Sequence, residues 1–368
     1  MRTGPGPLVA ALLWLCCAVS QAQILIGQTV GVTGAVAATV KESNTGAMLY
    51  LDAVNARGGI AGEKIELITL DDQFDTKLAA ANAQKLIEER HVVALFMSRG
   101  TPHTEGLVPI LERHGVPLIG PSTGAMTLHQ PVRRHIFNVR ATYQREAERA
   151  VAHLASMGMT RIGIIHVDDS FGADGLAGTQ KGLAVAKLQA VAVAKFDRSK
   201  PDFSAVAPQM VKSEAQAILI IGSGTAVVDG IRAVKAAGSG AQFVTLSNNA
   251  SAGFIKLLGE HGRGVIVSQV LPQSFAYAIV KEATQLARSR DIADLSPAML
   301  EGFASAKVLV EALRRAGPKP SAEKIQIALE GLRKFDIGGL EVSYSSTDHT
   351  GLDFADLSII SADGKFRR

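Results

Sequence analysis

The feature that most constrains the fold is a regular alternation of short apolar runs with longer amphipathic segments. The apolar runs are typical of strands, which we expect at residues 24–30, 65–71, 92–97, 117–120, 161–167, 190–195, 217–221, 242–246 and 265–270. Helical patterns lie between them, for example at residues 76–89, 143–157, 225–237 and 297–316. Strand, helix and strand at spacings of about 25–30 residues indicate βαβ units. The sequence therefore predicts an α/β protein with parallel sheets between helices.

The length of 368 residues suits two domains of roughly 150 residues each. Its 38 Lys and Arg residues nearly balance 34 Asp and Glu residues, and the arginine pairs are short and far apart. A protein that binds nucleic acid usually concentrates its positive charge on one surface. We therefore expect no nucleic-acid partner.

Residues 1–22 have the pattern of a secretory signal peptide, with Arg2 before an apolar run and small residues at positions 20 and 22. We expect cleavage after Ala22 and a periplasmic location. The apolar run is shorter than the roughly 20 residues that span a bilayer. Cleavage would remove both cysteines of the chain, Cys16 and Cys17. We therefore expect neither a disulfide nor a thiolate metal site in the mature protein.

Five loops that follow predicted strands are rich in hydroxyl groups, amides and glycine. They are Ser98 to Pro102, Pro121 to Gly124, Asp168 to Gly172, Gly222 to Thr225 and Ser247 to Asn249. Ligands of open α/β sheets bind outside the carboxyl ends of the strands, where backbone N–H groups can hold an anion. Such residues are also ordinary helix N-caps. Five loops of this kind together favour a binding site.

Catalytic interpretations of these loops are less well supported. Residues 120–124 fit the nucleophile-elbow pattern of hydrolases around Ser122, and Asp336 or Asp348 with His349 would complete a triad. Residues 222–227 carry only part of a dinucleotide fingerprint, because Val227 stands where the third glycine belongs. The histidines are scattered singly. We expect a protein that is not an enzyme and that uses no cofactor and no metal.

Several stretches, taken in order along the chain, carry a specific resemblance. They are residues 52–62, the Asp71-Asp72 strand end, 100–102, 115–125, 137–143, 168–175, 301–303 and 338–340. In these stretches the chain resembles the type I periplasmic solute-binding proteins, in the leucine/isoleucine/valine-binding branch that serves ABC importers. The resemblance covers nearly all of residues 24–365.

This resemblance implies two Rossmann-like lobes joined by three hinge strands. The chain would cross between the lobes near residues 140–143, 270–273 and 338–342. Lobe one would then comprise residues 23–141 plus 273–338, and lobe two residues 142–272 plus 339–368. A small molecule would bind between the lobes of a monomer, which would deliver it to an inner-membrane ABC permease.

The resemblance also implies the ligand contacts. In lobe one they would be Ser98, Arg99, Gly100, Thr101, Ser122 and Thr123, which correspond to loops that hold a ligand carboxylate. In lobe two they would be Tyr143, Phe171, Ser223, Ser247 and Asn248. Amino-acid binders of the family usually present an acid where this chain has residues 247–249, so we expect Asp168 or Asp169 to replace it. Arg99 stands where relatives carry an uncharged residue, and it either clamps a carboxylate or faces solvent.

The sequence leaves the ligand open among an amino acid, an aromatic or short organic acid without an ammonium group, and a neutral amide. The partner is an importer or, as an alternative, a signalling protein that senses the ligand. An exported hydrolase using Ser122 is the remaining alternative.

Overall fold

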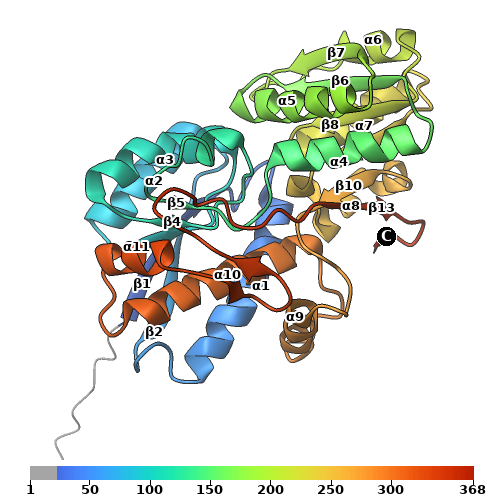
Figure 1. The fold of residues 1–368 in the computed structure, drawn as a ribbon. Coiled ribbons are helices and arrows are strands. Elements are labelled where there is room, and N and C mark those ends of the chain that lie inside the picture. The colour runs from blue at the N-terminus through green and yellow to red at the C-terminus, as the bar shows by residue number, and fades with distance from the viewer. Residues whose placement is uncertain (1–22) are drawn as a thin grey trace, which may run out of the picture.

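The computed structural model describes residues 23–368, which form two α/β lobes (Figure 1). The predicted signal peptide and its cleavage site lie outside these residues. Within the described residues, no helix is both long enough and apolar enough to cross a membrane. The predicted fold class is confirmed.

The first lobe is built on a five-stranded parallel sheet with the order β2-β1-β3-β4-β5. Its strands are β1 (Gln23–Val30), β2 (Lys64–Asp71), β3 (Ala94–Phe96), β4 (Leu118–Ile119) and β5 (Ile136–Phe137). Its helices are α1 (Ala37–Ala56), α2 (Thr76–Glu88), α3 (Thr101–His114), α9 (Ala278–Arg288), α10 (Pro297–Ala316) and α11 (Ala322–Glu330). Leu95 and Leu118 pack with α2 and α3, whereas Phe96 and Ile119 pack with α1 and α10. Helices therefore cover both faces, as the continuous apolar strands require.

The second lobe is built on a seven-stranded sheet with the order β14-β13-β10-β9-β8-β6-β7. Its strands are β6 (Ile162–Val167), β7 (Ala190–Phe196), β8 (Ala217–Ile221), β9 (Gln242–Thr245), β10 (Ile266–Gln269), β13 (Asp356–Ile360) and β14 (Phe366–Arg367). Its helices are α4 (Tyr143–Ser156), α5 (Ser170–Val185), α6 (Val206–Lys212), α7 (Thr225–Ala236) and α8 (Ala252–Leu258). The strands are parallel except β13 and β14, which pair antiparallel. Single 3₁₀ turns occur at Met126–Leu128, Ser247–Asn249 and Gly259–Gly262.

The predicted elements are found where the sequence places them. The helix Pro297–Ala316 and the strand Ala217–Ile221 have the expected ends, and the other predicted strands and helices overlap the observed ones. Caps explain several helix starts. The Asp75 carboxylate accepts hydrogen bonds from the first turn of α2, and the Thr142 hydroxyl does the same for α4.

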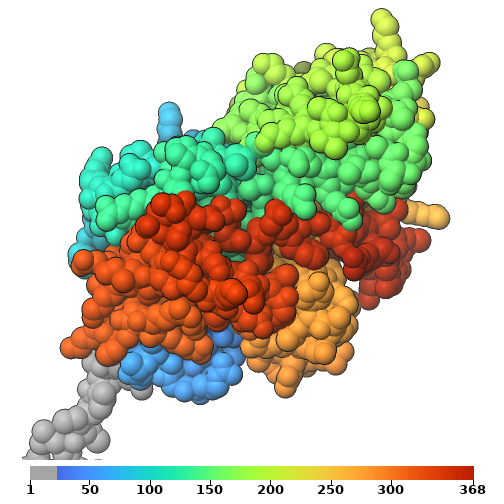
Figure 2. Space-filling view, in the orientation of Figure 1, coloured from blue at the N-terminus to red at the C-terminus, as the bar shows by residue number. Residues whose placement is uncertain are grey.

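We propose a later position for the third crossing between the lobes than the expected residues 338–342. Gly338 and Gly339 have φ of 121° and 96° and turn the chain into a hairpin of β11 (Phe335–Asp336) and β12 (Glu341–Val342). Tyr344 and Leu352 then pack into the core of the first lobe. We therefore propose that the first lobe extends to about Leu352. The C-terminal residues, red in Figure 2, run from the first lobe onto the second.

Candidate functional site

A cavity of about 240 Å³ lies between the two lobes. Ala35 and Phe74 line it from the first lobe, and the second lobe contributes Val167, Phe196, Arg198, Ser199, Pro201, Ser223, Thr225 and Ala226. Most of these side chains are apolar, and Arg198 is the one that carries a charge. The cavity lies at the carboxyl ends of strands β2, β6, β7 and β8, where an open α/β sheet binds its ligands.

Phe74, which lines this cavity, lies in a strained stretch of backbone. Gln73 and Phe74 have φ of 52° and 60°, a conformation that costs free energy in a bulky residue and often marks a functional site. The Phe74 ring stacks on the His103 imidazole with 4.3 Å between the ring centroids. On the second lobe, the guanidinium carbon of Arg198 lies 5.0 Å from the Phe74 centroid. Burial lowers the His103 pKa to about 4, so the imidazole is neutral at pH 7. The Phe74 ring thus contacts His103 of its own lobe and Arg198 of the second lobe, so it bridges the two lobes.

Arg198 is held in place by the start of α5. Its Nε donates a hydrogen bond of 2.5 Å to Asp169 Oδ2. The other carboxylate oxygen of Asp169 accepts from the backbone N–H groups of Phe171 and Gly172, which caps α5. The helix start thus fixes the carboxylate, and the carboxylate fixes the arginine at the cavity wall.

Among the predicted hydroxyl groups of the first lobe, those of Thr101 and Thr123 bond to each other, and that of Ser98 bonds to Thr104. The Ser98 hydroxyl lies 2.9 Å from that of Thr104, and the Thr101 hydroxyl lies 2.8 Å from that of Thr123. Gly100 precedes α3 with φ of 92°, which favours glycine at this position. The contact between Thr101 and Thr123 joins the loops after β3 and β4 into one surface.

Arg99 crosses from this surface to the second lobe. Its Nη2 donates to the backbone oxygen of Asn248 at 2.6 Å, and its Nη1 donates to Ser122 Oγ at 3.3 Å. The residue is only 4% exposed, and burial lowers its pKa. The interpretation of Arg99 as a solvent-facing arginine is therefore wrong.

Behind Arg99 lies a buried charge network centred on Arg140. Arg140 Nη2 donates to Glu146 and also to Ser247 Oγ, the latter at 2.6 Å. Arg140 Nη1 lies 3.6 Å from Glu301 Oε1, which also accepts a hydrogen bond of 3.0 Å from Ser122. Burial opposes the charge of Arg140, but the two glutamates raise its pKa above the ordinary value. The network connects α4, α10 and the first crossing.

The pattern of the periplasmic binding protein family matches residues 23–361. The chain belongs to this family. The Leu/Ile/Val-binding protein of Escherichia coli (strain K12) is 26% identical over 269 residues, 70% of this chain and 72% of that protein. A Leu/Ile/Val-binding protein of Rhizobium johnstonii is 26% identical over 96% of both chains. The crystal structure of a substrate-binding periplasmic protein from Ralstonia solanacearum is 30% identical, with a TM-score of 0.86, and covers 94% of this chain and 99% of that chain.

The second-lobe residues expected in the site of this periplasmic binding protein are found at the cavity wall, in the buried interior and at the exposed surface. Ser223 lines the cavity. Tyr143 and Phe171 are buried with 4.7 Å between their ring centroids, and Ser247 and Asn248 bond to Arg140 and Arg99. Asp168 lies apart from these residues. Its side chain is 52% exposed and forms an ion pair of 2.7 Å with Lys195. The proposed replacement of a missing site acid by Asp168 is not supported by this position.

The partners of Ser122 and His349 do not form a catalytic triad. Ser122 bonds to Arg99 and Glu301. The His349 ring stacks on Phe137 with 4.0 Å between the centroids, and its Nδ1 lies 3.0 Å from the backbone oxygen of Ile136. Within residues 23–368, no three His, Cys, Asp or Glu side chains are arranged to hold a metal ion.

Sequence reasoning missed Phe74, His103 and Arg198. Phe74 follows β2 and Arg198 follows β7, so the rule that selected the other loops would also have selected these two. Both loops lack the runs of hydroxyl groups that distinguish the five predicted loops.

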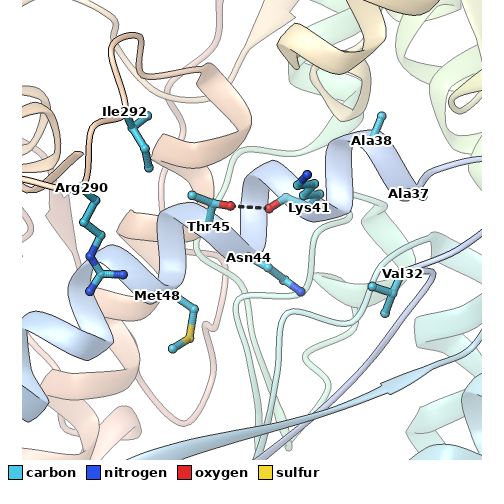
Figure 3. Close-up of a pocket in the computed structure, with 9 residues that line it drawn as sticks. All are labelled: Val32, Ala37, Ala38, Lys41, Asn44, Thr45, Met48, Arg290 and Ile292. Atoms are coloured by element: carbon cyan, nitrogen blue, oxygen red, sulfur yellow. Dashed lines mark hydrogen bonds between the residues drawn. The ribbon is translucent and has the colours of Figure 1, made fainter. Parts of the chain in front are cut away.

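A larger hollow of about 720 Å³ lies along α1 (Figure 3). Its lining comes from the first lobe alone, with side chains of Lys41, Asn44, Thr45 and Met48 on the helix and Arg290 and Ile292 beside it. The Thr45 hydroxyl donates to the backbone oxygen of Lys41 at 2.8 Å. Unlike the smaller cavity, this hollow includes no residue of the second lobe, and it is less suited to a ligand that holds two lobes together.

Proposed function

We propose that this protein is a periplasmic solute-binding protein that captures a small amino acid or carboxylate between its lobes. It delivers the ligand to an inner-membrane ABC permease and does not transform it. The observation that carries the proposal is the 240 Å³ cavity lined from both lobes. A ligand there contacts both lobes and so favours the closed arrangement, because closure follows from differential affinity. The names of the Leu/Ile/Val-binding relatives support the same class of ligand.

The proposed ligand contacts are the expected residues Ser98, Arg99, Gly100, Thr101, Ser122 and Thr123 of lobe one, and Tyr143, Phe171, Ser223, Ser247 and Asn248 of lobe two. To these we add Phe74 and Arg198, because they line the cavity and touch each other across it. The apolar walls favour a ligand with an apolar body, and the hydroxyl and guanidinium groups favour one with a carboxylate.

A thermal-shift screen tests the proposal directly. Residues 23–368, refolded to remove any bound ligand, are screened against amino acids, organic acids and small amides. A ligand at 100 times its Kd adds about 2.7 kcal/mol to the free energy of unfolding. Ala226→Leu fills the cavity and should abolish the shift. Ala236→Leu, at the exposed end of α7, serves as the matched control and should keep it. Undiminished binding by Ala226→Leu would place the ligand elsewhere.

A further inference from the structure

We infer that the cleft selects a carboxylate that carries no ammonium group, and that Arg99 is the residue that determines this selection. The inference rests on the proposed function, and it narrows the ligand from an amino acid or carboxylate to the carboxylate alone. It is carried by the charges on both sides of the cleft.

Arg99 is a buried cation whose bonding partners are neutral. Its two hydrogen bonds go to the Asn248 backbone oxygen and the Ser122 hydroxyl, and its Nε has no partner. Among the described residues, no carboxylate lies within 4.0 Å of its guanidinium. The charge of Glu301 raises the pKa of Arg99, but Glu301 is joined to Arg99 only through Ser122 and also pairs with Arg140. A buried charge without a bonded counter-ion is costly. A ligand carboxylate would supply the missing negative charge and would bond bidentately to a guanidinium.

The two buried glutamates near Arg99 are already engaged. Glu146 accepts from Arg140, from the Ser247 backbone N–H and from the Ser268 hydroxyl. Glu301 accepts from Ser122 and pairs with Arg140. Neither glutamate is left to bind a ligand ammonium group.

The aspartates around the cavity are engaged as well. Asp169 caps α5 and pairs with Arg198. Asp72, behind Phe74, accepts from the Thr29 hydroxyl and the Phe74 backbone N–H, and its carboxyl does not line the cavity. An ammonium group in this cleft would therefore meet guanidinium groups and find no free acid.

The second lobe offers an amide where an acid would be needed. The buried Oδ1 of Asn248 has no hydrogen-bond partner, while the Nδ2 of Asn248 donates to the Gly222 backbone oxygen and to Ser223. A neutral amide oxygen does not offset an ammonium charge, and the Arg99 guanidinium is bound to the backbone of the same residue. The ligand ammonium would face a like charge here.

The residues of the cavity wall indicate what the rest of the ligand is like. Phe74, Phe196, Val167 and Pro201 offer an apolar surface, and Arg198 adds a second guanidinium. Burial lowers the pKa of Arg99, and the positive charges of Arg140 and Arg198 lower it further, against the opposing charge of Glu301. Arg99 itself does not line the 240 Å³ cavity, so we infer that the carboxylate extends from this space to Arg99 while an aromatic or branched apolar body fills it.

Matched ligand pairs test the inference on the unchanged protein. Isothermal titration compares 3-phenylpropanoate with phenylalanine, 4-methylpentanoate with leucine, and each acid with its primary amide. We expect each acid to bind at least tenfold more tightly than its amino acid or amide. Tighter binding of the amino acids would overturn the inference while leaving the proposed function standing. If none of these six compounds binds and no compound of the thermal-shift screen binds, both the inference and the proposed function would be overturned.

Variants then test the role of Arg99. Arg99→Gln should weaken binding of the acids at least 30-fold and leave the amide affinity within threefold, and Arg99→Lys should retain part of the acid affinity. Arg145→Gln removes one exposed positive charge of α4 and should change nothing. The melting temperature of each unliganded variant verifies folding. Equal losses for acid and amide, or no loss for either, would show that Arg99 does not select the ligand. If Arg99→Gln fails to fold, the ligand pairs on the unchanged protein and on Arg99→Lys decide the question.

Discussion

Arg140 binds glutamates from two different lobes, Glu146 of α4 and Glu301 of α10. All three side chains are buried, so each depends on the others for compensation of its charge. Ser247 and Ser268 add hydrogen bonds to the same network. A buried ion pair of this kind adds little net stability, but the loss of one member leaves an uncompensated charge behind.

We predict that Arg140→Gln lowers the free energy of unfolding by about 3–5 kcal/mol, because Glu146 then keeps its charge without a cation. Urea unfolding followed by circular dichroism at pH 7 measures this loss. The double variant Arg140→Gln with Glu146→Gln should recover part of it. Arg149→Gln, an exposed arginine of α4, is the control and should stay within about 0.5 kcal/mol of the unchanged protein. An equally small effect of Arg140→Gln would contradict the prediction.

At the scale of the elements, α1 and α10 approach each other through a pair of glycines. A Cβ on Gly46 would lie 1.8 Å from the backbone oxygen of Met299, and one on Gly302 would lie 1.9 Å from that of Ser43. The two backbones are therefore in direct contact. Because α10 also carries Glu301, this packing sets the position of a carboxylate in the buried network.

We predict that Gly46→Ala destabilises the protein by about 1–3 kcal/mol, since the helices must separate to make room for the methyl group. The gain in helix propensity, up to about 1 kcal/mol, is smaller than this cost. Gly106→Ala in α3 is the matched control, because its Cβ would meet its nearest neighbour only at 3.9 Å. Thermal unfolding should show a lower Tm for Gly46→Ala and an equal or higher Tm for Gly106→Ala. A neutral or stabilising Gly46→Ala would refute the close approach.

The sequence predicts the elements better than it predicts the crossings and the site. Apolar runs and caps are local signals, and they place β8 and α10 at their observed ends. The resemblance implies a crossing near residues 338–342, and the glycine pair there is compatible with either a crossing or the observed hairpin. The burial of Arg99 depends on contacts with Asn248, far along the chain. The positive φ of Phe74 likewise depends on tertiary contacts that no local pattern records.

At the scale of the whole molecule, the two lobes also contact each other through residues that do not line the cavity. Glu42 of α1 accepts hydrogen bonds from the backbone N–H groups of Ala252 and Gly253 at the start of α8, at 3.0 and 2.7 Å. Glu105 of α3 accepts a hydrogen bond of 2.6 Å from Ser170 of α5. These contacts join residues of different lobes, so they stabilise only the arrangement in which the lobes are close together.

We predict that Glu42→Ala weakens ligand binding by about 1–2 kcal/mol, or 5- to 30-fold, because the closed form loses charge-assisted hydrogen bonds that the open form lacks. Isothermal titration measures the affinity, and small-angle X-ray scattering should show a larger radius of gyration without ligand. Glu112→Ala, on the exposed face of α3, is the control and should leave both quantities unchanged. An unaltered affinity in Glu42→Ala would mean that this contact does not contribute to closure.

The order of the chain through the lobes has a consequence for biosynthesis. The core of the first lobe joins residues of β1 and α1 to residues of α10 and to Tyr344 and Leu352, near the other end of the chain. The second lobe draws most of its sheet from one continuous segment, β6 to β10. A chain that emerges from the ribosome N-terminus first can assemble that continuous segment while the first lobe still waits for its last helices. The first lobe therefore begins first but cannot cover the face of its sheet that packs on α10 until most of the chain has been made.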